Sequence, residues 1–434
     1  MLQALKTIFG GEFNRNVATL VTGTALAQII PLVITPFLSR IYSPEQFGIF
    51  ALFTAVLSSL SVLATGRYEL AIGLPRNDVN AVNIAAFSIS ACTIFSLIAL
   101  FTVCAAIEVP KAIPNSRAVS SWLYFVPVAI LLNGIYINLN YWSNRKKLYS
   151  VMAQRRVVQS GGTSAAQLIL GLLRPGYGGL IIGNITGQAI ATGMLASMVQ
   201  RKDPIIWRSI SRRRMCAMAK RYINCPKLLV PAHTLSALAI QLPTIFINTQ
   251  FGLSPSGHFM LAERIVGVPL SLVSASIGDV FRQRIAECYL GGQNCRREFI
   301  SVFKKLATIA TPPFLVLVIF APDLFALFFG ERWRVSGEYA QIMCPMFYMR
   351  FISNPLSLTA IVAQKNVFEL VWQAGLLIVL AIVACSHRFL QLKVEDYILG
   401  FVGINVIFDV VNLIGCYVFA CQGDIRERTI VPSH

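Results

Sequence analysis

Long apolar runs separated by short polar segments make up most of this chain. A helix that crosses a bilayer needs about 20 mostly apolar residues, and twelve runs approach or exceed that length. The fifth is the weakest because Arg155 and Arg156 stand at its start. Strands of membrane barrels are short alternating segments, so these solid runs predict an all-α polytopic membrane protein. The expected spans lie near residues 17–39, 47–66, 81–107, 120–142, 157–173, 179–200, 228–250, 257–278, 306–329, 338–363, 366–385 and 395–420.

Composition agrees with this pattern. Of 434 residues, 56% are hydrophobic and only 13% are charged, and the mean hydropathy is +0.65. Soluble domains carry about 25% charged residues, so this chain has too few charges to cover the surface of a soluble protein. Disordered chains combine low hydrophobicity with high charge. The composition therefore excludes an ordinary soluble enzyme and a disordered chain.

The net charge of +18 comes from 37 basic and 19 acidic residues. In a soluble protein such a surplus would suggest nucleic acid, but cytoplasmic loops of membrane proteins are enriched in Lys and Arg. With the N-terminus in the cytoplasm, 27 basic residues fall on inner segments and eight on outer loops. The surplus is therefore an orientation signal that places both termini in the cytoplasm, and we expect no nucleic-acid partner.

The longest polar segment, residues 201–227, divides the runs into two groups of six. This predicts an N-terminal lobe at 1–200, a basic cytoplasmic linker at 201–227 and a C-terminal lobe at 228–434. The linker carries nine basic residues and a single acid, Asp203. Such a segment is typically held at the membrane surface by anionic lipids, and a regulatory or partner-binding site is the alternative.

The two halves repeat a set of residues in the same order. The order is Gln, Pro, Ser-Pro and Gly-x-Phe, at offsets of 209 to 213 residues. Because each half would have six spans, the repeats would run parallel and be related by a pseudo-twofold axis along the membrane normal, as in transporters built of two rocking lobes. The matched residues are Gln28, Pro31, Ser43, Pro44, Gly48 and Phe50 in the first half, and Gln241, Pro243, Ser254, Pro255, Gly257 and Phe259 in the second.

Prolines interrupt the first and seventh runs at Pro31, Pro36, Pro231 and Pro243. Proline removes a backbone donor and favours a kink. Interrupted helices at matching positions of two halves point to a hinge or a central cavity. The alternative is that membrane helices simply tolerate proline.

The sixth run carries glycines at every fourth position, at Gly179, Gly183 and Gly187. This spacing puts all three on one helix face. Such a face allows another helix to approach closely, so we expect a packing surface here.

Motifs of catalysis and of nucleotide or metal binding are absent from the sequence. There is no GxxxxGK[ST], HExxH or GxSxG, the four histidines are scattered, and the ten cysteines form no CxxC pair. The longest expected outer loop, 108–119, is short for a membrane enzyme that acts on external sugars. We therefore expect no catalytic residue, metal or cofactor, and the pattern favours transport over catalysis.

Five ionisable residues inside expected spans are candidates: Glu263, Arg264, Arg350, Asp409 and Glu369. Glu369 is close to the inner end of its span, where its side chain can reach the membrane surface, so the other four carry the argument. A charge at the bilayer centre costs at least about 2.5–3.5 kcal/mol on insertion scales, so it usually faces a partner or a wet cavity. Arg264 and Arg350 are candidates for binding an anionic head group. Asp409, with Glu263, is a candidate for cation coupling. The alternative is that these residues form structural charge pairs, for example Arg350 with Asp409.

Several stretches resemble bacterial O-antigen and capsule polysaccharide flippases of the Wzx type. These proteins belong to the multidrug/oligosaccharidyl-lipid/polysaccharide exporter superfamily. The likeness covers nearly the whole chain. It is carried by FLSRIYSPEQFGIFALF, GRYELAIGLPRND, LNYWSNRKKLYSVMAQRRVVQS, QLPTIFINTQFGLSPSGHFMLAERIVGVPLSLVSASIGDVFRQRIAE and FGERWRVSGEYAQIMCPMFYMRFISNPLS.

The resemblance implies a transporter of two six-helix lobes in the bacterial inner membrane. It implies flipping of undecaprenyl-diphosphate-linked oligosaccharide from the cytoplasmic to the periplasmic leaflet, with H⁺ or Na⁺ as coupling ion. In related flippases a helix-eight arginine is proposed to meet the pyrophosphate, and Arg264 sits in the matching helix. Membrane lipids, a polysaccharide polymerase and a chain-length regulator are the other implied partners. A cation-coupled multidrug exporter of the same superfamily and a membrane polysaccharide polymerase or ligase remain alternatives.

Overall fold

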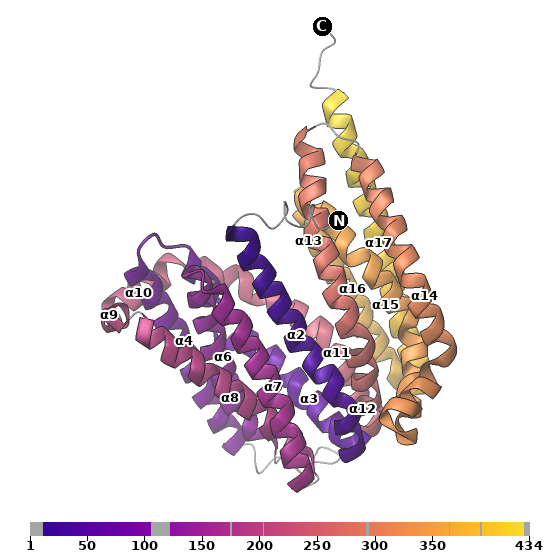
Figure 1. Cartoon of the computed structure of the whole chain (residues 1–434), viewed down its shortest axis with the longest axis horizontal. Helices are drawn as coiled ribbons and strands as arrows, with labels where there is room; N and C mark the ends of the chain where they lie inside the picture. Colours follow the sequence, from indigo (N-terminus) through magenta and orange to yellow (C-terminus); the bar gives the residue numbers. More distant parts are fainter. Residues whose placement is uncertain are drawn as a thin grey trace. The chain divides into compact units, whose positions relative to one another are not determined.

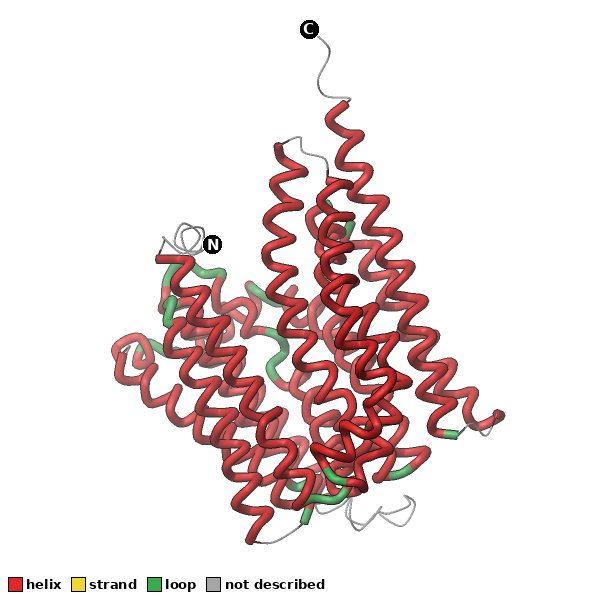
Figure 2. The backbone as a smooth tube through the Cα atoms, turned by 45° about the vertical axis from the view of Figure 1, so that its right-hand side comes forward, coloured by secondary structure: helices red, strands yellow, loops and turns green. Residues whose placement is uncertain are grey.

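A computed structural model describes residues 12–105, 122–173, 176–202, 204–291, 295–363, 365–390 and 393–428. Every regular element in these ranges is helical (Figure 2), which confirms the predicted all-α membrane fold. Nine of the described helices are long and apolar enough to cross a membrane. Expected spans 157–173, 338–363 and 366–385 fall on helices that do not meet this criterion, so the number twelve stays a prediction. The loop at 108–119 and both chain ends lie outside the described residues.

The chain forms two compact units, Met1–Gln241 and Leu242–His434. Their boundary falls within helix α11 (Val230–Phe251), and residues of the basic segment 201–227 pack with the first unit. The predicted lobe boundaries, 1–200, 201–227 and 228–434, stay a prediction.

The first unit is a bundle of long helices with a shorter helical module at one end (Figure 1). Helix α7 contacts α2 on one side and α8 on the other. The long helices are α2 (Glu12–Ile41), α3 (Pro44–Ala64), α4 (Asp78–Ala105), α6 (Phe125–Arg145), α7 (Tyr149–Leu173) and α8 (Tyr177–Lys202). The shorter elements are the 3₁₀ helix η1 (Tyr68–Gly73), α9 (Pro204–Arg208), α10 (Arg212–Arg221) and the π-helix η4 (Cys225–Leu229).

The glycine face of α8 packs against α7, as its spacing predicts. A Cβ atom on Gly183 would lie 2.6 Å from the Gln167 Cγ and 2.7 Å from the Gln167 backbone nitrogen. Real Cβ atoms essentially never come this close to other heavy atoms. Glycine is therefore required for the observed separation of the two helices.

The fifth helix begins earlier than the hydropathy pattern predicts. Helix α7 starts at Tyr149, so Arg155 and Arg156 lie inside the helix and not in a loop before it. The Arg156 Nη1 atom donates to the Thr24 hydroxyl of α2 at 2.5 Å. A polar partner on a neighbouring helix makes this position tolerable, and a hydropathy window cannot detect such a partner.

The basic segment after α8 packs onto the end of the first unit. Ser211 donates its backbone N–H to the Asn83 side chain at 2.9 Å, and the Tyr68 hydroxyl donates to the Ala219 carbonyl at 3.2 Å. Trp207 lies edge-on to Trp142, with ring centroids 5.9 Å apart. These contacts join the segment to the hydrophobic core of the unit. The arginines at the start of α10 are left exposed.

Several basic residues at this end of the unit are paired with acids. Arg145 and Lys146 contact Asp78 at 2.9 and 2.6 Å. Arg67 contacts the fully buried carboxylate of Glu69 at 3.3 Å. These residues therefore hold the loop between α3 and α4 in place, in addition to any orientation role.

The second unit is built around α15 (Arg334–Val362), which contacts α13, α14 and α17. Helices α12 (Leu253–Ala262) and α13 (Val268–Gly291) continue each other through the π-helix η5 (Glu263–Gly267). The remaining elements are α14 (Cys295–Phe329), the 3₁₀ helix η6 (Glu331–Trp333), α16 (Asn366–Leu390) and α17 (Val394–Arg428).

The repeated Ser-Pro motif opens a helix in each unit. Ser43 caps α3 with a capping box and Pro44 is its first residue, a position where proline costs no hydrogen bond. Ser254 and Pro255 lie in the first turn of α12, which follows Gly252 with a φ of 100°. The repeated Ser-Pro pair therefore lies at the start of a helix in each unit, as cap and first residue in α3 and inside the first turn in α12.

Candidate functional site

The four ionisable residues predicted to lie inside the membrane all belong to the second unit. Glu263 and Arg264 are the first residues of η5. A π-helix inside a longer helix is uncommon and often marks a functional site. Both side chains are half-buried.

Arg264 lies within a helix that is long and apolar enough to span the membrane, Leu253–Tyr289. Among the residues that the structure describes, none gives its guanidinium a hydrogen bond or an ion pair. A guanidinium always carries its charge in proteins and has five N–H donors. In a membrane it therefore needs water or an anion, so Arg264 is suited to bind an anionic group.

Arg350 lies on α15 and is half-buried. Its Nη2 atom donates to the Asn405 Oδ1 atom of α17 at 2.7 Å. The amide of Asn405 in turn donates to the Phe401 carbonyl at 2.7 Å, one turn earlier on α17. Asn405 is thus oriented by its own helix and positions the guanidinium of Arg350.

Asp409 follows Asn405 by one turn of α17 and is 5% exposed. The Ser353 hydroxyl is a hydrogen-bond partner of its carboxylate, while the buried Oδ2 atom has no partner among the described residues. Arg350 attracts both Asp409 and Glu263 electrostatically. No contact ion pair joins these three side chains in the described structure, so the site is a charged group of three and not a closed Arg350–Asp409 pair.

Asp409 has polar neighbours on α17 that were not among the residues predicted from the sequence. Asn405 and Asn412 are 3% and 1% exposed, and the Cys416 thiol donates to the Asn412 Oδ1 atom at 3.3 Å. The spacing of positions 405, 409, 412 and 416 puts all four on one helix face. The helical spacing of these polar residues in the last expected span is the sequence signal of this stripe.

The site supplies two kinds of group to a ligand. Arg264 supplies an unpaired cation, and Asp409 supplies a buried carboxylate oxygen that lacks a donor. Within the described ranges, no group of three His, Cys, Asp or Glu residues could hold a metal ion. The arrangement therefore suits an anion at the arginines and a proton or a monovalent cation at Asp409.

The prolines predicted to act as hinges have different positions in their helices. Pro31 and Pro36 lie inside α2, and Pro243 lies inside α11. Pro231 lies in the first turn of α11, directly after the π-helix η4. Pro31 and Pro36 each have a hydroxyl bonded to their carbonyl, from Thr35 and from Ser39. A hinge role for all four stays a prediction.

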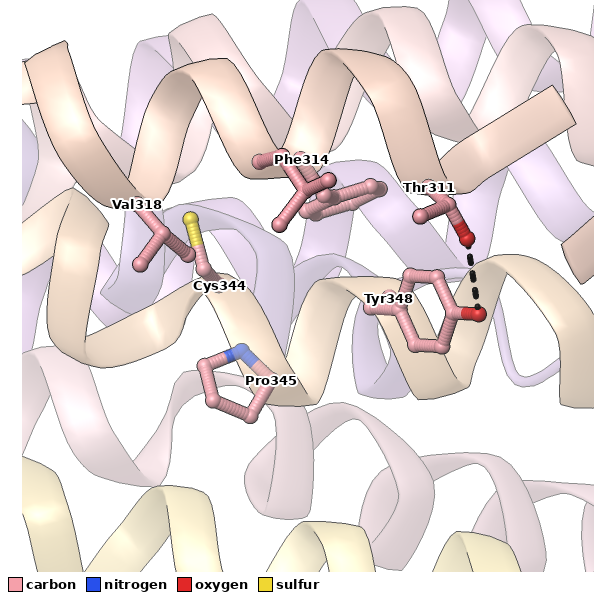
Figure 3. A pocket seen from close by; sticks show the side chains of 7 residues that line it. Thr311, Phe314, Val318, Cys344, Pro345 and Tyr348 are labelled. Carbon is pink, nitrogen blue, oxygen red and sulfur yellow. Dashed lines mark hydrogen bonds between the residues drawn. The ribbon is translucent and has the colours of Figure 1, made fainter. Parts of the chain in front are cut away.

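A separate cavity of about 250 Å³ lies between α14 and α15. Figure 3 shows its lining side chains, and the Thr311 and Tyr348 hydroxyls lie 3.3 Å apart in a hydrogen bond. The lining residues are Thr311, Phe314, Leu315, Val318, Cys344, Pro345 and Tyr348. The cavity has no charged group, so it is suited to hydrocarbon and not to an anionic head group.

Known proteins resemble this chain in sequence and in fold. A family model described as "Polysaccharide biosynthesis protein" matches residues 37–338. A Klebsiella pneumoniae protein described as an uncharacterized membrane protein in the cps region is 21% identical over 331 residues, or 74% of this chain and 64% of that protein. The lipopolysaccharide biosynthesis protein WzxC of Escherichia coli K12 is 24% identical over 119 residues, or 27% of this chain and 24% of that protein. The chain thus spans less than two-thirds of the length of each relative.

The fold resembles that of a solved membrane protein. The inward closed structure of the lipid II flippase MurJ superposes with a TM-score of 0.69 at 11% identity, covering 96% of this chain and 93% of that chain. At this identity the likeness shows a shared fold.

Proposed function

The chain belongs to the polysaccharide biosynthesis protein family, and we propose that it flips lipid-linked oligosaccharide across the bacterial inner membrane. The substrate would be an undecaprenyl-diphosphate-linked repeat unit, carried from the cytoplasmic to the periplasmic leaflet by alternating access. The names of the relatives support polysaccharide assembly, and the fold is one that a lipid flippase also uses. In this proposal both termini are cytoplasmic, and a polymerase and a chain-length regulator act on the product.

The observation that carries the proposal is the unpartnered guanidinium of Arg264 inside a spanning helix. Flipping a glycolipid moves a diphosphate and many hydroxyls through hydrocarbon, where every unsatisfied polar group is costly. A cation at membrane depth lowers that barrier for the diphosphate while the polyprenyl chain stays in lipid. Arg350, positioned by Asn405, would add a second cation.

Asp409 is the proposed coupling residue, with Glu263 as the second acid. Its buried Oδ2 atom lacks a donor among the described residues and can take up a proton or a monovalent cation such as Na⁺. Since Arg350 attracts both acids, an ion bound at Asp409 would weaken the hold of that carboxylate on Arg350. This links ion binding to the availability of a cation for the substrate.

The proposal is tested in a strain that lacks the gene for this chain. We expect single lipid-linked repeat units to accumulate on the cytoplasmic side, and the wild-type chain to restore surface glycan. Arg264→Ala should restore less than a tenth of the wild-type glycan, at equal protein levels. Arg282→Ala is the matched control, because Arg282 lies on α13 of the same continuous helix and its side chain is 60% exposed.

Normal surface glycan in the deletion strain, with no other flippase present, would refute the proposal. A cation-coupled multidrug exporter is the competing function, and it predicts altered drug resistance with no trapped repeat units. The unpaired cation of Arg264 disfavours it for the usual cationic drugs, because like charges repel at low dielectric.

A further inference from the structure

A second polar region lies wholly inside the first unit, where α7 contacts α2 and α8. Arg156 bonds to Thr24, and the Ser160 hydroxyl donates to the Ala27 carbonyl of α2. The amide of Gln159 donates to the Gln188 side chain of α8. Three helices thus meet through polar side chains.

The segment of α7 from Arg155 to Ser160 is too polar to face lipid. Helix α7 is long enough to cross a membrane, yet it is absent from the apolar candidate spans of the described chain. Polar residues at membrane depth face protein or a water-filled cavity. Exposed apolar residues such as Ile169 and Leu172 lie further along the helix and are suited to contact lipid.

Three buried polar atoms in this region are left without a partner among the described residues. They are the Gln28 Oε1 atom of α2, the Arg155 Nε atom of α7 and the Gln188 Nε2 atom of α8. Each unsatisfied buried group costs about 1–3 kcal/mol. Such groups are rare in folded proteins and call for an explanation. A ligand that bonds to them would remove this cost.

The chemistry of the three atoms indicates which ligand fits. The Gln28 oxygen accepts a hydrogen bond, while the Arg155 and Gln188 nitrogens donate. A phosphate dianion offers only acceptors and would leave Gln28 unsatisfied. A sugar hydroxyl both donates and accepts, so a hydroxyl-rich ligand satisfies all three.

We propose that these residues form a sugar-binding site, the α7 seam, defined by Gln28, Arg155, Gln159 and Gln188. Its ligand is the oligosaccharide part of the lipid-linked substrate, so the inference rests on the proposed function and extends it. Under the predicted orientation α7 begins at the cytoplasmic side, and Arg155 lies about 9 Å from its start at 1.5 Å per residue. The α7 seam thus lies on the part of α7 nearest the expected cytoplasmic side.

The test compares two probes bound to the full chain in lipid nanodiscs. One probe is lipid-linked oligosaccharide extracted from the deletion strain, and the other is undecaprenyl diphosphate, which has no sugar. Gln28→Met and Gln188→Met keep the side-chain volume and remove the amide. Each should raise the Kd for the oligosaccharide probe about five- to tenfold, the loss expected for one or two hydrogen bonds. The Kd for undecaprenyl diphosphate should stay within twofold.

Gln154→Met is the matched control, because Gln154 lies on α7 itself but is exposed. It should change neither Kd. Arg264→Ala should raise the Kd for both probes, because both carry the diphosphate, and this pattern differs from the one expected for the seam variants. An unchanged Kd for oligosaccharide in both seam variants, or an equal rise for both probes, would overturn the α7 seam and leave the flippase proposal intact. If the wild-type chain binds neither probe, the proposed function itself fails. Arg155→Met provides a further seam variant if either glutamine variant does not fold.

Discussion

Arginine has several roles in this protein, and its surroundings decide which one applies. Arg145 is held by Asp78 at 2.9 Å near the end of α6, where the ion pair fixes a loop. Arg156 sits inside α7 and bonds to a hydroxyl of the next helix. Arg264 sits inside a spanning helix without a hydrogen-bond or ion-pair partner among the described residues. A charge inside a spanning helix without a partner lowers the stability of the folded protein. This is why we propose that Arg264 binds the substrate.

Asp409 is the residue at which we expect ion coupling to fail selectively. Asp409→Asn keeps the size of the side chain and removes its charge. We expect substrate binding within twofold of wild type and transport that no longer responds to an imposed H⁺ or Na⁺ gradient, measured in proteoliposomes. Asp279→Asn is the control, because the Asp279 side chain is 70% exposed. Gradient-dependent transport by Asp409→Asn would remove the coupling role.

At the scale of elements, close packing and helix irregularities position the functional groups. The π-helix η5 interrupts the α12–α13 helix at Glu263 and Arg264. Gly267 at its end lets the Phe347 ring of α15 approach, since a Cβ there would lie 3.1 Å from the ring. In the first unit, the glycine face of α8 brings Gln188 within reach of α7. Small residues thus decide which polar side chains meet.

Gly183→Ala should destabilise the first unit through overpacking. The added methyl group would meet the backbone of α7 at 2.7 Å, and overpacking of a tight contact costs about 1–3 kcal/mol. We expect a lower melting temperature in detergent. Gly193→Ala, on the same helix, is the control because nothing lies within 4 Å of its Cβ position; it should be neutral or slightly stabilising. Equal melting temperatures for both variants would contradict the packing described.

Pro243→Ala tests the hinge prediction for α11. Alanine restores a backbone donor in the helix interior and stiffens it. If α11 bends during alternating access, the transport rate should fall about tenfold, while the Kd for the lipid-linked oligosaccharide stays within twofold. Proteoliposome transport and nanodisc binding measure the two quantities. An unchanged transport rate would show that Pro243 is only tolerated.

At the scale of the whole molecule, two compact units are joined through one helix, α11. The unpaired cation lies in the second unit, and the α7 seam lies in the first. Residues of the basic segment 201–227 are packed onto the first unit through Trp207 and Ser211. The exposed arginines of α10 remain available to anionic lipid head groups.

The predicted topology is tested with reporter fusions. A fusion after Ser211 should place alkaline phosphatase in the cytoplasm, where it is inactive. A fusion after Gly330, in the turn between α14 and α15, should place it outside, where it is active. Green fluorescent protein fused at the same two sites should give the opposite pattern. The reverse result would invert the orientation inferred from the basic residues.

Much of the architecture could be predicted from the sequence because lipid imposes a simple rule. A spanning helix must be apolar over about 20 residues, so hydropathy located nearly all of the long helices. The Gly183 packing face was predictable for a related reason, since only small side chains allow helices to approach. The rule missed the start of α7, where Arg156 bonds to a hydroxyl that only a neighbouring helix supplies.

The sequence by itself determined the membrane class and singled out four charged residues within long apolar runs, because burial in lipid constrains each position separately. Only the tertiary structure decided which of those charges have partners. Asn405 could not be assigned to Arg350 from the sequence, since the two lie on different helices and meet through packing. The same holds for Gln28, Arg155 and Gln188, whose unmet hydrogen bonds exist only when three helices are brought together. Whether a charged side chain has a hydrogen-bond or ion-pair partner depends on distances in the folded protein. A charge with a partner can be structural, and a buried charge without one is a candidate for binding a ligand.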